Sequence, residues 1–587
     1  MGTSPLTRRR LLGIAGVAAG MGLLSACGPA APSSTGAPTS PPAAAPKPTT
    51  PPAAAATTAP AAPTSAPATQ PTTAPAAAAT TAPATTSGAT AANTLTFLFA
   101  GDTNRLDPPA MDAQEGFIAT TAIYEGLVRY KSGSTDVEPA LAEKWDLSTD
   151  GLQVVFHLKP GVMFHDGSPL NAQAVAFSFD RSINKDNPLY QEAQGDYGGF
   201  PYIGDYISNV VTKVEAVGDL DVQFTLNRKF SPLLSNLAIP PAYVISMEAL
   251  KKYGKGINEN PVGTGPFKFV EWKKDDHITV DAFDGYWGTR AKLQRIIFQP
   301  VPEPSVRALK IQNGEADVTW AVDPKDVPTL KGQANTDVLE QPGLNVNMAE
   351  FNLTMPQLQN KALRQAMNYA INKQELADSL YTGAGTPATG VLPPTSWAFN
   401  SDLHAYPFDP DKARAMLQDA GYNGDMLTLD TYTIARGYNP QGSKLAEAVQ
   451  QYLDDVGVKT QIQTGEWTQY RTDRRAAKLH VAFGGWQADT GDPENFLGVF
   501  FNSVNKGGVN TSFYGTPDVD QLLNSANEET DTAKRKDLFN QAERMIVDDA
   551  PWLFIGHMKQ QAALRKRVQN FVQQPTYIYY FNNVALG

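Results

Sequence analysis

Apolar runs with the two-residue period of half-buried strands recur from residue 94 onward. Two of them, Thr212–Val217 and Asp221–Leu226, flank the turn residues Gly218-Asp219 and predict a β-hairpin. Helical patterns lie between the strand-like runs, and this mixture over about 500 residues predicts a large α/β protein with more than one lobe. The other strands that we expect are Thr94–Phe99, Val154–Leu158, Ile278–Ala282, Ile296–Pro300 and Lys459–Gln463.

Three segments carry apolar side chains at the spacing of one helical face. The stripe is clearest in the third, where positions i, i+4, i+7 and i+8 are apolar. We expect all three to face the core rather than a cofactor. The positions are Val175 and Phe179, then Leu363, Met367, Ala370 and Ile371, and then Leu445, Val449, Tyr452 and Leu453.

Residues 1–27 have the pattern of a signal peptide. Arg8-Arg9-Arg10 form a basic start, and the apolar run that follows is too short for a comfortable membrane span. The run ends at Leu24-Ser25-Ala26-Cys27, which matches the cleavage box of bacterial lipoproteins, so Cys27 is the predicted lipidation site. An ordinary export signal is the alternative reading, and both the twin-arginine and the general export route stay open.

Residues 28–92 are almost wholly Ala, Pro, Thr and Ser, and Lys47 is their one charged residue. No apolar face offsets the entropy of ordering this segment, so we expect a disordered tether. Its reach would be roughly 45 Å as a flexible coil and about 200 Å as polyproline II. The part predicted to fold, residues 93–587, is then held outside the cell membrane on a lipid anchor.

Charge and cysteine content narrow the classes of protein. The chain has 48 Lys and Arg against 59 Asp and Glu; all of the acids but only 44 of the bases follow residue 101, which leaves a net charge of −15 there. An acidic protein of this kind is not expected to bind nucleic acid or an anionic membrane surface. Its single cysteine excludes an intrachain disulfide and thiolate metal sites.

The sequence motifs of common enzymes are absent. There is no Walker loop, no Gly-x-Ser-x-Gly elbow, no dinucleotide-binding glycine motif and no His-Glu-x-x-His helix. His157 and His165 flank a turn and are expected to be hydrogen-bonded or solvated rather than metal ligands. Asp489 and Asp492 are two acids that could in principle act as a glycosidase pair. We expect neither catalysis nor a cofactor nor a metal.

Several stretches are typical of one family when they occur in this order. The most characteristic are Asn260-Pro261-Val262-Gly263-Thr264-Gly265-Pro266-Phe267 and the loop from Trp486 to Phe496; the others lie at residues 124–128, 139–145, 156–167, 177–181, 286–288, 363–370 and 393–397. Together they resemble the solute-binding proteins of peptide-importing ABC transporters (bacterial extracellular solute-binding protein family 5), with dipeptide-binding proteins the most similar in look. The resemblance covers residues 94 to 587.

The resemblance implies a periplasmic-binding-protein-like fold of two α/β lobes. Lobe I is expected at residues 93–344 and 558–587, with an extra subdomain inserted at about 128–261, and lobe II at residues 345–557. The hinge would lie near 343–345 and 557–560. A ligand would dock on lobe II first, lobe I would close over it, and the closed monomer would engage an ABC permease and its ATPase.

The resemblance also implies a dipeptide site. An Arg at the position of Arg436 takes the ligand's carboxylate, and an Asp at the position of Asp489 takes its ammonium group. A planar guanidinium matches a carboxylate, and an acceptor-only carboxylate suits the three donors of an ammonium. Aromatic walls are expected from Tyr197, Trp397 and Trp486. Here Gly437 follows Arg436 where the family typically has Pro, a departure from the family's pattern.

Other readings stay open at this point. Arg436 could pair with a surface acid, and Asp489 could cap a helix that starts near Pro493. Within the family the ligand could be a longer peptide, a nickel chelate, haem, an oligosaccharide or an opine. An anchored glycoside hydrolase and a purely structural surface protein are the remaining alternatives.

Overall fold

A computed structural model describes residues 93–111, 114–193 and 204–587. The predicted signal peptide with Cys27, the predicted tether 28–92 and Tyr197 lie outside the described residues. Every helix in the described ranges is too short or too polar to cross a membrane.

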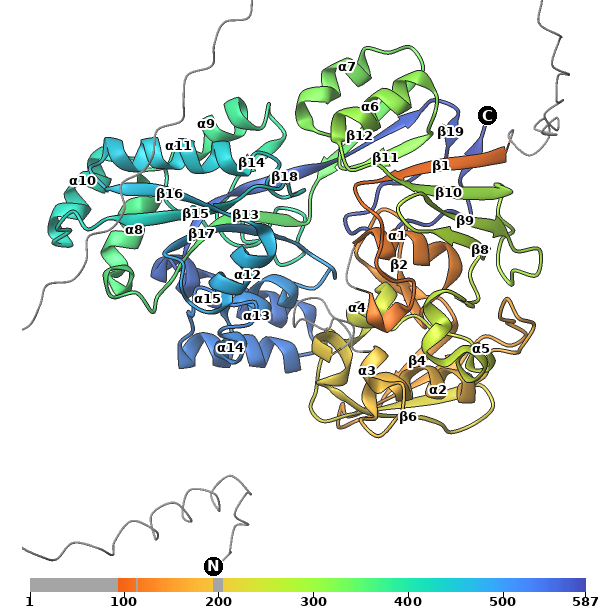
Figure 1. Cartoon of the computed structure of the whole chain (residues 1–587). Helices are drawn as coiled ribbons and strands as arrows, with labels where there is room; N and C mark the ends of the chain where they lie inside the picture. Colours follow the sequence, from red (N-terminus) through yellow and green to blue (C-terminus); the bar gives the residue numbers. More distant parts are fainter. Residues whose placement is uncertain (1–92, 112–113, 194–203) are drawn as a thin grey trace, which may run out of the picture. The chain divides into compact units, whose positions relative to one another are not determined.

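The largest sheet within the described ranges has twelve strands and is mixed (Figure 1). Its main path runs β16-β15-β17-β13-β18-β11-β1-β10-β9-β8, and β12 and β14 pair with β18 beside this path. The bounds are β1 Thr94–Phe99, β8 Phe267–Lys273, β9 His277–Ala282, β10 Arg295–Pro300, β11 Val318–Trp320, β12 Thr336–Pro342, β13 Asn345–Phe351, β14 Gly385–Pro387, β15 Leu427–Tyr432, β16 Thr460–Gly465, β17 Val481–Gln487 and β18 Trp552–Arg565.

Strand β18 joins the two halves of this sheet. Its first residues pair with β13, residues 556–558 pair with β14, and residues 559–565 pair with β12. One continuous strand therefore takes its hydrogen bonds first from the half formed by residues 345–487 and then from the half formed by residues 94–342.

The point where β18 changes partners is tied to the start of β13 by one side chain. The Asn345 amide donates to the carbonyl of Met558 at 2.8 Å and accepts from its N–H at 2.7 Å. The ring of His557 bonds through Nδ1 to the carbonyl of Asn345 at 2.7 Å, and burial lowers the pKa of His557 to about 4. A neutral imidazole whose Nδ1 carries the proton satisfies this bond. We refer to the two hydrogen bonds between the Asn345 amide and Met558 as the Asn345 clamp. Gly343 leaves room for it, because a Cβ there would lie 2.1 Å from Nδ2 of Asn345.

Residues 345–557 bury apolar side chains on both faces of β13, β17 and β18. Trp552 and Phe554 belong to one core, and Leu553 and Ile555, which alternate with them, belong to the other. Helices cover both faces (Figure 1). Their bounds are α8 Lys361–Tyr369, α9 Lys373–Glu375, α10 Pro410–Asp419, α11 Gly442–Asp455, α12 Trp467–Arg475, α13 Glu494–Phe501, α14 Pro517–Glu528 and α15 Thr532–Asp549.

A second sheet, ordered β4-β5-β7-β6, has its own apolar core, to which Phe156, Phe179 and Phe224 contribute. A fourth core surrounds β1 and β8–β10. The bounds in this part of the chain are α1 Gln114–Ile123, β2 Val128–Tyr130, β3 Val137–Pro139, β4 Ala142–Leu147, β5 Gln153–Leu158, α2 Ala172–Ile183, α3 Tyr190–Ala193, β6 Val211–Ala216, β7 Asp221–Leu226, α4 Leu233–Leu237, α5 Met247–Tyr253, α6 Pro304–Asn313, α7 Val327–Lys331, β19 Val568–Gln569 and β20 Ala585–Leu586.

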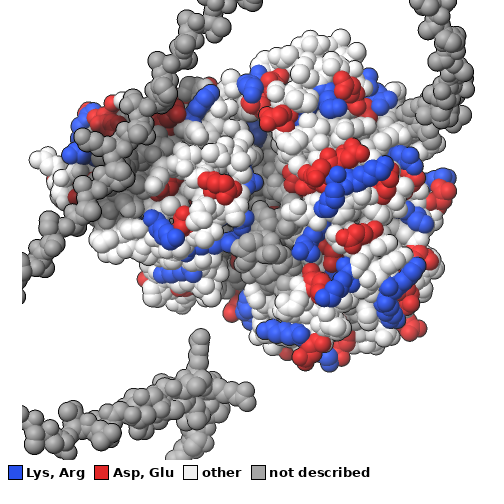
Figure 2. Space-filling view, in the orientation of Figure 1, with Lys and Arg blue, Asp and Glu red and all other residues white. Residues whose placement is uncertain are grey.

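The element predictions are confirmed. Strand β1 has the bounds expected from the sequence, and β6 and β7 form the antiparallel hairpin. The first and third helical stripes lie on α2 and α11, and on α11 the side chains of Leu445, Val449 and Leu453 are fully buried. Of the second stripe, Leu363 and Met367 lie on α8, whereas Ala370 and Ile371 follow its last residue and are buried there. On the face shown in Figure 2, acidic and basic side chains are interspersed without a large area of one sign.

Gly343→Ala is expected to destabilise the protein by at least about 2 kcal/mol, because its Cβ would displace the Asn345 amide from Met558. Thermal unfolding followed by circular dichroism measures the effect. Gly256→Ala is the matched control, since the nearest atom to a Cβ there is 4.0 Å away. Equal melting temperatures for the two variants would contradict the clamp.

Candidate functional site

A cavity of about 940 Å³ opens between the two halves of the twelve-stranded sheet. Its lining comes from both halves: Glu115, Arg307 and Trp320 on one side, and Arg436, Trp467 and Asp489 on the other. Residues that join the halves, Met558–Gln561, also contribute. The volume lies within the range of small-molecule and cofactor sites.

The loop between β17 and α13 brings an acid into this cavity. Asp492 makes a two-pronged ion pair with Arg535, at 2.9 and 3.0 Å, and both side chains are buried. Asp492 also accepts from the N–H of Glu494 at the start of α13. Arg535 of α15 therefore holds the loop in place, and Asp489 is left to face the cavity.

Asp489 is a buried carboxyl group, with 5% of its surface exposed. Tyr206 donates its hydroxyl to Oδ2 of Asp489 at 2.9 Å, and the N–H of Asp489 donates to the side chain of Asn495 at 3.0 Å. Burial raises the pKa of Asp489 to about 7, and the bond from Tyr206 opposes this rise only in part. A buried acid of this kind favours a ligand that brings a positive charge.

Arg436 lies in the turn between β15 and α11, which is closed by hydrogen bonds between the backbone groups of Arg436 and Asn439. Its guanidinium carbon lies 4.0 Å from the centre of the Trp467 ring, in a cation–π arrangement. Its Nε is buried and has no hydrogen-bond partner among the described residues. The guanidinium is thus positioned by stacking, and its N–H groups are available for an anion at the cavity.

Helix α12 adds further arginines to the same wall. Arg471, Arg474 and Arg475 all line the cavity, and the charge of Arg474 is balanced by buried Glu350, which it contacts at 2.7 Å. The side chain of Glu466 accepts from the N–H groups of Thr468 and Gln469 and so starts the helix. The wall around Trp467 therefore carries several arginines, whereas Asp489 is an acid on the same side of the cavity.

The other aromatic predictions have different outcomes. Trp486 lines the cavity; its Nε1 donates to Asn495 at 3.0 Å and its ring meets Phe500 edge to face. Trp397 is not among the residues that line it: its ring packs on Phe539 and on the guanidinium of Arg535. The expectation that Trp397 forms a wall is corrected on this point, because its ring covers the buried ion pair instead.

The geometry also bears on the alternative readings. Asp489 does not cap α13: the N-cap residue is Pro493, and the carboxylate that accepts from the N–H of Glu494 is that of Asp492. Both oxygens of Asp492 are engaged by Arg535, so Asp492 is poorly placed to serve as a glycosidase acid. His157 bonds two aspartates and His165 bonds the carbonyl of Gly265. The described ranges hold no cluster of three or more His, Cys, Asp or Glu side chains suited to a metal.

Sequence reasoning did not single out Tyr206, Asn495 or Trp467. Asn495 lies six residues after Asp489 on the same loop and helix, so its closeness was a local signal that could have been used. Tyr206 is 283 residues away from Asp489. No local pattern indicates a contact of that kind, nor the stacking of Arg436 on Trp467.

Comparison with known proteins places the chain in a family. The family model for bacterial extracellular solute-binding proteins, family 5, matches residues 136–508. The dipeptide-binding protein of Escherichia coli (strain K12) is 35% identical over 509 residues, 84% of this chain and 95% of that protein. Heme-binding protein A of Haemophilus influenzae is 36% identical over 77% of this chain and 85% of its own length.

A solved structure supports the same placement. The dipeptide-binding protein of Pseudoalteromonas sp. SM9913, in complex with Met-Leu, superposes with a TM-score of 0.75 and 28% identity, over 84% of this chain and all of that chain. The mixed α/β architecture matches such two-lobed periplasmic binding proteins, as predicted. All three relatives are described as binding proteins. The chain belongs to the bacterial extracellular solute-binding proteins of family 5.

Proposed function

We propose that the protein is the lipid-anchored, extracytoplasmic receptor of an ABC importer and that it binds dipeptides or short peptides between two closing lobes. The observation that carries the proposal is one cavity lined by both a buried acid, Asp489, and a guanidinium with an unpartnered Nε, Arg436. A short peptide is a zwitterion with one charge at each end. When the acid and the guanidinium are both fixed on the part formed by residues 345–557, only a peptide of matching length can pair both of its charged ends.

The two proposed lobes share strand β18. Lobe I is residues 93–344 with 558–587, and lobe II is residues 345–557. The inserted subdomain, about 128–261, is supported by the separate core around β4–β7. The crossings proposed at 343–345 and 557–560 coincide with the Asn345 clamp and with the change of partner along β18. Closure of lobe I over a ligand docked on lobe II then presents one surface to the permease and its ATPase.

The location of the receptor is proposed from the sequence alone. Cys27 carries the lipid, and residues 28–92 tether the folded part to the cell membrane. Such a tether raises the effective concentration of the receptor near its permease.

One observation favours a second candidate ligand within the same role. The cavity is roomy, and a relative of similar identity is described as a heme-binding protein. A longer peptide, a haem or another anionic ligand would find cationic partners along α12, where Arg471 and Arg475 line the cavity. Dipeptides remain the proposal because they use Asp489 as well as Arg436.

Asp489→Asn and Arg436→Gln are each expected to weaken binding of Ala-Ala by at least about thirtyfold, because each leaves one charged end of the ligand unpaired inside the cavity. Isothermal titration calorimetry measures the affinities. Asp411→Asn and Arg414→Gln are matched controls, since this exposed pair lies outside the cavity. If dipeptides bind the first two variants as well as the wild type, the site is wrong; if none binds the wild type, the ligand class is wrong.

The affinity for Ala-Ala is expected to rise with pH between about 5 and 7 and to fall again above about pH 8, where the ligand's own ammonium group loses its proton. Burial raises the pKa of Asp489 from its ordinary value of 3.8 to about 7, so below pH 7 a proton must leave before the ammonium can bind an ionised carboxylate. The stability of the ligand-free protein is expected to change with pH in the opposite direction. The contribution of Asp489 to the free energy of unfolding is present below about pH 4 and is lost as the pH rises through 7.

Calorimetry at pH 6 in two buffers of different ionisation enthalpy reports the proton released on binding. We expect close to one proton for the wild type, and none for Asp489→Asn where binding is still detectable. Binding by the wild type without proton release and without pH dependence would contradict the assignment of Asp489 to the ammonium group.

A further inference from the structure

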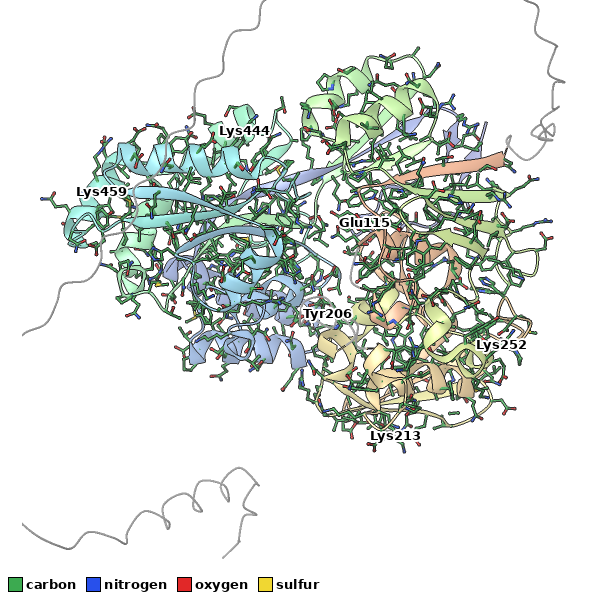
Figure 3. All side chains as sticks on the ribbon, in the orientation of Figure 1. Glu115, Tyr206, Lys213, Lys252, Lys444 and Lys459 are labelled. Atoms are coloured by element: carbon green, nitrogen blue, oxygen red, sulfur yellow. The ribbon has the colours of Figure 1, made fainter. Side chains whose placement is uncertain are left out.

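Tyr206 connects two separately cored parts of the protein. It lies on the short π-helix Gly204–Ser208, and its side chain is 2% exposed within the core around β4–β7. Its hydroxyl reaches Asp489 at 2.9 Å and the Asn495 amide at 2.6 Å, both of which belong to the loop and helix that follow β17. Figure 3 labels Tyr206 at this boundary.

The direction of the proton in this contact follows from the donors around it. Oδ1 of Asn495 accepts from the N–H of Asp489 and from Nε1 of Trp486, both at 3.0 Å, and both of these groups are donors only. The other end of the amide, Nδ2, must therefore donate to the Tyr206 oxygen. A phenol has one proton, and since its oxygen already accepts from Asn495, that proton points to Oδ2 of Asp489.

Other hydrogen bonds join the same two parts but do not end on a carboxyl group. The N–H of Gly491 donates to the hydroxyl of Tyr130 at 3.0 Å, and the N–H of Ser231 donates to the carbonyl of Asn527 at 2.7 Å. Their strength does not depend on what occupies the cavity. The strength of the bond from Tyr206 does, because its acceptor is the carboxyl group that faces the cavity.

We propose that Tyr206 couples recognition of a ligand's ammonium group at Asp489 to closure of the two lobes. The inference rests on the proposed function. In this role Tyr206 is a positioning residue: it engages Oδ2 and leaves Oδ1 of Asp489 for the ligand. When an ammonium group binds, Asp489 ionises and the O–H···O bond from Tyr206 becomes charge-assisted, which makes it roughly twice as strong as the neutral bond. Ligand contact in lobe II thereby strengthens a bond to lobe I.

The groups that face Asp489 are consistent with this role. The Tyr206 hydroxyl bonds to it directly, and the phenol of Tyr577 interacts with its charge; the pKa of Tyr577 is raised first by burial and then by Tyr579, Glu115 and Asp489. Asp492, on the same loop, has its charge balanced by Arg535. The bond from Tyr206 is the side-chain hydrogen bond that lowers the pKa of Asp489 against the effect of burial.

The first test needs no ligand. A carbon-13 NMR titration of the side-chain carboxyl groups, with the Asp489 signal assigned from Asp489→Asn, follows this acid in the wild type, in Tyr206→Phe and in Tyr130→Phe. We expect an upward shift of the Asp489 midpoint in Tyr206→Phe alone. Tyr130→Phe is the matched control, because it removes a buried phenol oxygen that also bonds to the loop after β17 but does not contact Asp489. An unchanged midpoint in Tyr206→Phe overturns the inference.

The second test measures binding of Ala-Ala and closure by small-angle scattering at pH 5, 6, 7 and 8. Tyr206→Phe is expected to bind about tenfold more weakly at pH 7, because one hydrogen bond to a charged group is lost. Its affinity is also expected to rise at a higher pH than the affinity of the wild type does. Tyr130→Phe is expected to keep the wild-type pH profile. Equal profiles in all three proteins overturn the inference. If the wild type binds no dipeptide, the proposed function fails, and the NMR titration still decides whether Tyr206 controls Asp489.

Discussion

Strand β18 and the Asn345 clamp are the constraint on which the two-lobed architecture depends. One strand supplies hydrogen bonds to both halves of the large sheet, so neither half is complete without it. The amide of Asn345 satisfies both backbone groups of Met558 where the partner strand changes, and the missing side chain at Gly343 lets the chain pass within contact distance. The cavity opens beside this crossing, where Met558 and Gln560 line it.

The two acids of the loop after β17 are buried in different ways. Asp492 is paired with Arg535 and has a structural role, whereas Asp489, three residues away, is buried and accepts a hydrogen bond from the phenol of Tyr206. Burial of an unpaired carboxylate is unfavourable, and the raised pKa of Asp489 expresses this cost. The same cost makes a cationic ligand favourable. Arg535 fixes the loop through its ion pair with Asp492, and this pairing leaves the carboxyl group of Asp489 at the cavity.

The scaffold elements could be predicted because each depends on its own neighbours in sequence. The alternation in 212–226 gave a hairpin, and the apolar stripe on 445–453 gave a helix with a buried face. The site was harder to predict. The wall assigned to Trp397 failed because its ring packs on Arg535, 138 residues later, a contact without a local pattern. Trp467 under Arg436 and Tyr206 beside Asp489 were not foreseen for the same reason.

By itself the sequence determined the fold class, the family resemblance, the regular elements and the two residues, Arg436 and Asp489, that line one cavity. Periodicity and motif order are properties of consecutive residues, so they can be seen without coordinates. Only the tertiary structure decided which acid of the loop is neutralised and which is left without a cation, and that Tyr206 reaches the latter from another core. Charge states inside a protein depend on burial and on partners distant in sequence, and both arise only when the chain is folded.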